Sequence, residues 1–104
     1  MAITTQNVGV VSQTVFTGPA DETAITMLSL CNHDVGPVDV DVHLVPLGGS
    51  ASTGNIILSS LEITANNSYV VNEKIFLNTG DTIVVAVLIA DDDKVTAVTS
   101  YVEV

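Results

Sequence analysis

The stretch that decides the fold is Val38-Asp39-Val40-Asp41-Val42-His43-Leu44, in which apolar and polar residues alternate strictly. A period of two is typical of a β-strand with one face in the core and one in water. The segment Ile83–Ile89 is apolar at every position, which indicates a strand covered on both faces. Either such a strand is central in a sandwich, or a neighbouring subunit covers its second face.

The rest of the chain supports an all-β fold. Valine, isoleucine and threonine supply 38 of the 104 residues, and these stiff side chains suit a pleated sheet. Turn sequences recur at short intervals, among them Asn78-Thr79-Gly80-Asp81, which we interpret as a hairpin loop with Gly80 in the left-handed conformation. We predict strands at residues 8–17, 23–32, 38–46, 54–60, 61–65, 69–77, 82–90 and 95–104.

These strands predict one domain, residues 8–104, folded as an antiparallel β-sandwich of about seven or eight strands, immunoglobulin-like or jelly-roll-like. Residues 1–7 form either an additional edge strand or an extended N-terminal arm. The pattern leaves both arrangements open.

Charge restricts the partners of the chain. Two basic and twelve acidic side chains give a net charge of −10, which disfavours nucleic acid and anionic membranes. We therefore expect neutral, apolar or basic protein surfaces as partners, although the acidity also serves solubility. The longest apolar run, Ile83–Ala90, is too short for a spanning helix, and residues 1–5 do not resemble a signal peptide. We expect synthesis in a cytoplasm.

Few residues suggest chemistry. Asp39, Asp41 and His43 share one strand face, but the wet face of a strand explains them without a metal. The cluster Asp91, Asp92 and Asp93 is the better candidate for calcium, yet it lacks the EF-hand pattern and is explained by a solvated turn. Cys31 lies in an apolar run and His33 in a turn. We predict no cofactor, no metal and no catalytic residue, and hence no enzyme.

The sequence resembles small all-β virion proteins of tailed bacteriophages, particularly phages of cyanobacteria and other aquatic bacteria. The residues that carry the resemblance are Met1–Thr5, Leu28–Asn32, Val40–Pro46, Ile63–Val70, Glu73–Asp81 and Ser100–Val102. The resemblance implies a single immunoglobulin-like or jelly-roll sandwich present in many copies on a head, neck or tail. Some of these proteins are decoration or cement subunits that bridge capsid proteins.

Together these observations predict a virion structural protein, made in the host cytoplasm, that decorates or cements a phage capsid. The expected partners are the major capsid protein or other virion proteins and further copies of the chain, as a trimer or another symmetric oligomer. We expect strand pairing through the first segment, with Ile3, Val8, Val10 and Val11 at the interface. Alternatives are a neck, tail or fibre component, and a small module that binds a host-surface glycan or protein.

Overall fold

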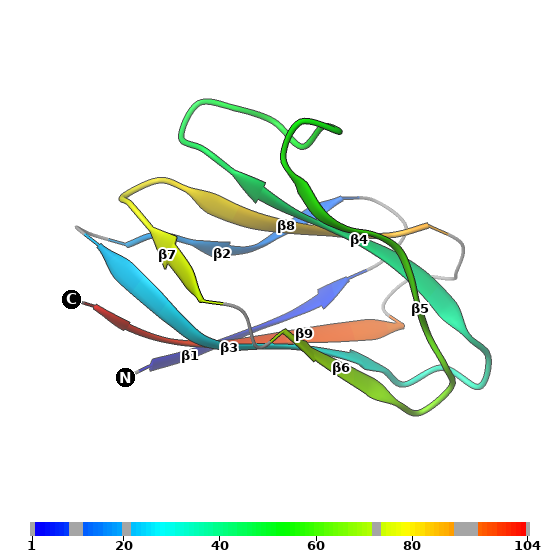
Figure 1. Cartoon of the computed structure of the whole chain (residues 1–104). Helices are drawn as coiled ribbons and strands as arrows, with labels where there is room; N and C mark the ends of the chain where they lie inside the picture. The colour runs from blue at the N-terminus through cyan, green and yellow to red at the C-terminus, as the bar shows by residue number, and fades with distance from the viewer. Residues whose placement is uncertain (1, 9–11, 20–21, 72–73, 89–93, 104) are drawn as a thin grey trace.

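A computed structural model describes residues 2–8, 12–19, 22–71, 74–88 and 94–103. These residues form two antiparallel sheets packed face to face, without a helix in the described ranges (Figure 1). The predicted all-β sandwich is therefore confirmed. Its strands are β1 (Ala2–Val8), β2 (Gln13–Thr17), β3 (Thr23–Asn32), β4 (Val38–Val45), β5 (Ile56–Ile63), β6 (Ser68–Val71), β7 (Ile75–Leu77), β8 (Thr82–Val87) and β9 (Val95–Glu103).

The strand order identifies the sandwich as a jelly roll. The five-stranded sheet has the order β1-β9-β3-β6, with β7 also paired to β3, and the four-stranded sheet has the order β2-β8-β4-β5. Because β6 and β7 pair with successive parts of β3, they act as one interrupted strand. The eight resulting strands then pair first with last, second with seventh, third with sixth and fourth with fifth. This nested pairing is the double wrapping of a jelly roll, the second of the two predicted topologies.

The core lies between the sheets and consists mainly of branched aliphatic side chains. Leu28 and Leu30 from β3 face Val40, Val42 and further apolar residues of the opposite sheet. Aromatic residues contribute one cross-sheet contact, because the Phe16 ring of β2 lies 4.7 Å from the Tyr101 ring of β9. Burial of these side chains is the main driving force for folding.

The apolar run that begins at Ile83 is central in its sheet, as one of the two readings of the sequence predicted. Strand β8 lies between β2 and β4, and Ile83, Val85 and Val87 point into the core. The outward side chain of Val84 is only half-buried, and Leu88 is exposed. This part of the run is therefore not covered on both faces within the chain.

Three predicted strand boundaries differ from the structure. The strand predicted at 8–17 is divided, because Val8 ends β1 in one sheet and Gln13 begins β2 in the other. The two strands predicted within 54–65 are one strand, β5, which has Ser60 at φ 50° and two register shifts against β4. The strand predicted at 69–77 is split into β6 and β7. Alternation specifies which residues face inward, but it does not specify where the chain changes sheets.

The turn at residues 78–81 has the predicted backbone conformation but the wrong predicted role. Gly80 has φ 85°, in the left-handed region, as expected. The turn is not a hairpin, however, because β7 and β8 belong to opposite sheets. The Asp81 carboxylate closes it by accepting hydrogen bonds from the Asn78 backbone N–H (2.9 Å) and, from another loop, the Leu47 N–H (3.0 Å). The hairpin prediction failed because a turn sequence does not reveal the partners of the strands that it joins.

Candidate assembly surfaces

The residues considered for metal binding have structural contacts. Asp39, Asp41 and His43 point away from the core on β4, as the alternation predicts. The Asp41 carboxylate accepts a hydrogen bond from the Ser60 backbone N–H (2.8 Å), and the buried His43 ring lies 2.8 Å from the Asn55 side-chain oxygen. No group of three potential metal ligands is present in the described ranges. The candidates Asp91, Asp92 and Asp93 lie outside them.

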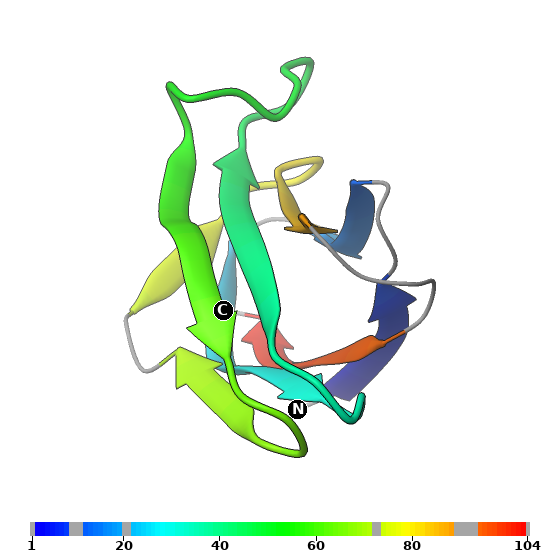
Figure 2. The same cartoon turned by 90° about the vertical axis from the view of Figure 1, so that its right-hand side faces the viewer.

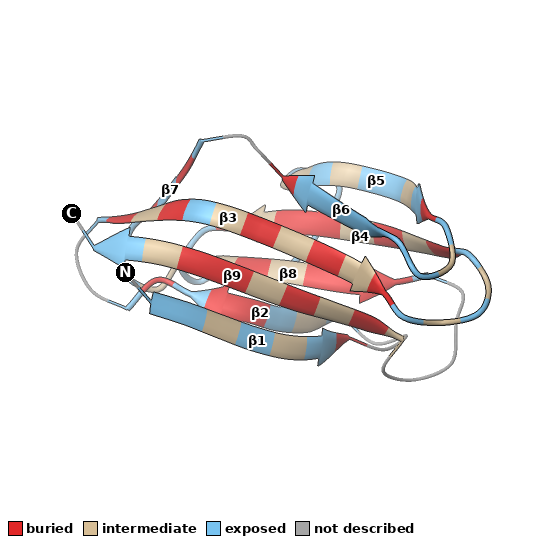
Figure 3. Cartoon of the chain, turned by 90° about the horizontal axis from the view of Figure 1, so that it is seen from below, coloured by how far each residue is buried: buried red, intermediate tan, exposed pale blue. Residues whose placement is uncertain are grey.

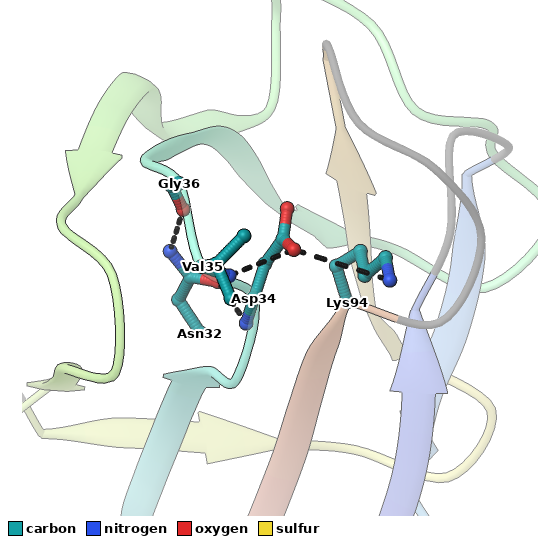
Figure 4. Close-up of polar contacts among 5 residues, drawn as sticks. All are labelled: Asn32, Asp34, Val35, Gly36 and Lys94. Atoms are coloured by element: carbon teal, nitrogen blue, oxygen red, sulfur yellow. Dashed lines mark hydrogen bonds and ion pairs between the residues drawn. The ribbon is translucent and has the colours of Figure 1, made fainter.

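A polar cluster at the β3–β4 connection supports the loop (Figure 4). Asn32 is fully buried, and its amide donates to the Gly36 and Ile63 carbonyls, each at 2.9 Å. Its side-chain oxygen accepts from the Asp34 backbone N–H. The Lys94 ammonium lies 3.9 Å from the Asp34 carboxylate, and both side chains are partly exposed. Because the buried polar atoms of Asn32 are paired, the cluster is explained by its contribution to the stability of the loop. His33, next to Asn32 in the chain, is exposed.

The outer face of the five-stranded sheet carries no charged side chain among its described strand residues. Directly paired residues of antiparallel strands share a face, so the register defines this surface. We call it the uncharged face, and it is shown toward the viewer in Figure 3. Its paired residues are Ile3, Thr5, Asn7, Ala24, Met27, Ser29, Cys31, Ser68, Val70, Phe76, Thr96, Val98, Ser100 and Val102, and the unpaired Thr26 joins them through a hydrogen bond with Ser100.

Large apolar side chains are exposed at one end of the uncharged face. Val102, Ala24 and Phe76 form a row across β9, β3 and β7, and the Phe76 side chain is 64% exposed. Ile3 on β1 is 65% exposed and is paired with Ser100, two residues before Val102. A shallow pocket of about 270 Å³ adjoins this end, lined by Ala2, Tyr101, Val102 and Glu103. Exposed apolar groups in the absence of charge are typical of a protein contact surface.

The outer face of the four-stranded sheet is chemically different. We call it the acidic face, because three of its outward residues, Asp39, Asp41 and Glu62, are carboxylates. Asp39 and Glu62 are direct cross-strand partners, an arrangement that destabilises a sheet through like-charge repulsion. Its other residues are Thr14, Thr17, His43, Val45, Ile56, Thr82, Val84 and Ala86. Contact through this face would require desolvation of charge.

The predicted interface residues of the first segment have different environments. Ile3 is exposed on the uncharged face, whereas Val8 is fully buried in the core opposite Val95. Of these two residues, only Ile3 presents its side chain at the surface. Val10 and Val11 lie outside the described residues.

The remainder of the uncharged face was not anticipated from the sequence. The charge of the separate segments gave no usable signal, because β2 and β8 of the opposite sheet also contain no Asp, Glu or Lys, and β9 contains Glu103. Only the fold reveals that β1, β3, β6 and β7, together with β9, form one surface.

Comparison of the chain with protein-family models, curated proteins and solved structures gave no match. In the described ranges, no helix has the length and hydrophobicity that crossing a membrane requires.

Proposed function

We propose that the chain is a non-enzymatic structural protein of a tailed-bacteriophage virion, a capsid decoration or cement protein that binds the shell in many copies. Its sequence resemblance to phage virion proteins supports this assignment. The observation that carries it is the uncharged face, whose described strand residues include no charged side chain, in a chain whose net charge is −10. We propose that the uncharged face contacts the shell while the acidic face points to solvent.

The physical basis is the cost of removing charge from water. The cores of protein interfaces are depleted of charged residues, because a carboxylate buried without a partner is strongly destabilising. At the centre of the uncharged face, Val98 is flanked by Thr5 and Ser29. These side chains lose little on dehydration, and exposed Ile3 and Phe76 gain from it. The acidic face would lose the hydration of Asp39 and Glu62 in the same contact.

Two valines provide a matched test of this orientation. Val98 on β9 and Val84 on β8 are both half-buried, and each lies on the outer face of an inner strand. We expect Val98→Glu to weaken cosedimentation with bare capsids by about tenfold or more, because it places an unpaired carboxylate in the contact. Val84→Glu adds the same charge to the acidic face and should leave binding unchanged. Circular dichroism of both variants checks that they are folded.

Equal capsid binding by Val98→Glu and the unchanged protein would contradict the proposed attachment face. Absence of binding by the unchanged protein would contradict the capsid assignment. Immunogold electron microscopy of virions then separates a shell location from the neck, tail or fibre location that the sequence also suggested.

A further inference from the structure

The four edges of the two sheets differ in how they are protected from pairing with another strand. Edge strand β5 has register shifts, a left-handed Ser60 and the charged Glu62. Edge strand β2 has a bulge between Thr14 and Phe16. The third edge is divided into the short strands β6 and β7. Bulges, charges and short length are the usual devices that prevent edge-to-edge association.

Strand β1 has none of these devices. Its seven residues, Ala2–Val8, pair with β9 in continuous register and include no charged residue, proline or glycine. It is an edge strand of its sheet and pairs with β9 on one side only (Figure 3). A regular, unprotected edge of this length is a template for an added strand. The exposed bond from the Gln6 side-chain amide to the Asn7 carbonyl is one that a paired strand can replace.

The surroundings of β1 indicate which partner fits. Strands β1 and β2 lie along the same side of the sandwich (Figure 2), and neither contains a charged residue. The carboxylates of Asp39, Asp41 and Glu62 belong to the β4–β5 side. A basic partner would be attracted to that acidic side. A second copy, which also carries a charge of −10, meets less repulsion at the β1 side than at the β4–β5 side, because Glu103 lies only beside the first residue of β1, Ala2.

We propose that β1 pairs antiparallel with β1 of a second copy about a two-fold axis at Thr5. This register pairs all seven residues of each strand, with Ile3 opposite Asn7, Thr4 opposite Gln6 and Thr5 opposite itself. Outward residues meet outward residues, so the two uncharged faces form one continuous surface. The inference rests on the proposed function, since the pair doubles the attachment surface and increases avidity for a repetitive shell. Each copy has one β1 edge, so the assembly closes at two copies, a symmetric oligomer smaller than a trimer.

Charges introduced at the two-fold axis test the pairing without capsids. We expect sedimentation equilibrium of the unchanged protein to give twice the chain mass of 10.8 kDa. Thr5→Glu and Thr5→Lys each place like charges opposite each other and should weaken the dimer by about fivefold. An equimolar mixture of the two variants should recover the association. The matched controls are Ser59→Glu and Ser59→Lys on the exposed β5 edge, which should not change it.

A monomer, a trimer, or a dimer that is insensitive to Thr5→Glu would overturn the pairing. So would equal weakening by the Ser59 variants. These outcomes are distinguishable from failure of the proposed function, because capsid binding of Val98→Glu and Val84→Glu is measured separately.

Discussion

The two outer faces of the sandwich have the same architecture and opposite chemistry. Each has an inner strand with a central valine, Val98 on the uncharged face and Val84 on the acidic face. Around Val98 the outward side chains are neutral, whereas the face around Val84 includes Asp41 and the opposed pair Asp39 and Glu62. Hydrophobicity alone does not separate the faces, because Ile56 and Val84 are also apolar. The two faces differ in charge, because the described strand residues of the uncharged face include no charged side chain.

The difference also shows that acidity has more than one role in this chain. Asp41 forms a hydrogen bond that shapes β5, whereas Asp39 and Glu62 face each other, and no described residue forms an ion pair or a side-chain hydrogen bond with either carboxylate. A pair of opposed carboxylates is retained on one face and is absent from the other. This pattern is expected if the acidic face remains in solvent and prevents unspecific association.

The largest change in stability is expected at one of the two aspartates of β4, Asp41, and not at the other, Asp39. Asp41→Ala removes the acceptor for the Ser60 N–H at a left-handed residue and should lower the free energy of unfolding by about 1–2 kcal/mol. Asp41→Asn keeps an acceptor oxygen and should therefore lower the free energy of unfolding by less. Asp39→Ala is the control and should be neutral or stabilising. Urea unfolding gives all three values, and equal losses at positions 39 and 41 would refute the distinction.

A smaller effect is expected from reversing one charge of the opposed pair. Glu62→Lys replaces repulsion of Asp39 by attraction and should stabilise the chain by about 0.5–1 kcal/mol. The gain should decrease at high salt, because exposed charges are screened. Thermal unfolding at low and high ionic strength measures both quantities. A loss of stability at low salt would contradict the assigned register of β4 and β5.

The smallest effect comes from building the same pair on the uncharged face. Ser29 and Val98 are direct partners on β3 and β9, as Asp39 and Glu62 are on the other sheet. Ser29→Asp combined with Val98→Asp should show an unfavourable coupling energy of about 0.2–1 kcal/mol in a double-mutant cycle. A coupling energy of zero would mean that the two side chains are not neighbours on one face.

Sequence alone predicted the parts of the fold that depend on local pattern. Strict alternation located β4, and the turn at Gly80 has the expected left-handed backbone. It did not predict that residues 78–81 join opposite sheets, because the partner of each strand depends on contacts between distant segments. Asn32 illustrates the same limit, since its amide reaches the Ile63 carbonyl across the sandwich. No local pattern contains that bond.

The uncharged face was predicted only in part, because it too depends on contacts between distant segments. The sequence suggested that the first segment is an assembly element, and the structure places Ile3 on the surface but Val8 in the core. The uncharged face requires the register of β1, β9 and β3 together, as in the row Thr5, Val98 and Ser29. Register between distant strands is fixed by packing of the whole core.

The central claim is that the uncharged face is covered when the protein is bound to its shell. Cys31 is a natural reporter, because this half-buried thiol lies on that face, opposite Thr96 and Ser68. Its rate of maleimide labelling should fall by about tenfold or more on capsid binding, as water is excluded from the contact. A thiol on the acidic face, Thr14→Cys in a Cys31→Ser background, should label at the same rate free and bound. Equal labelling of Cys31 in the free and bound protein, with protection at position 14, would contradict the account.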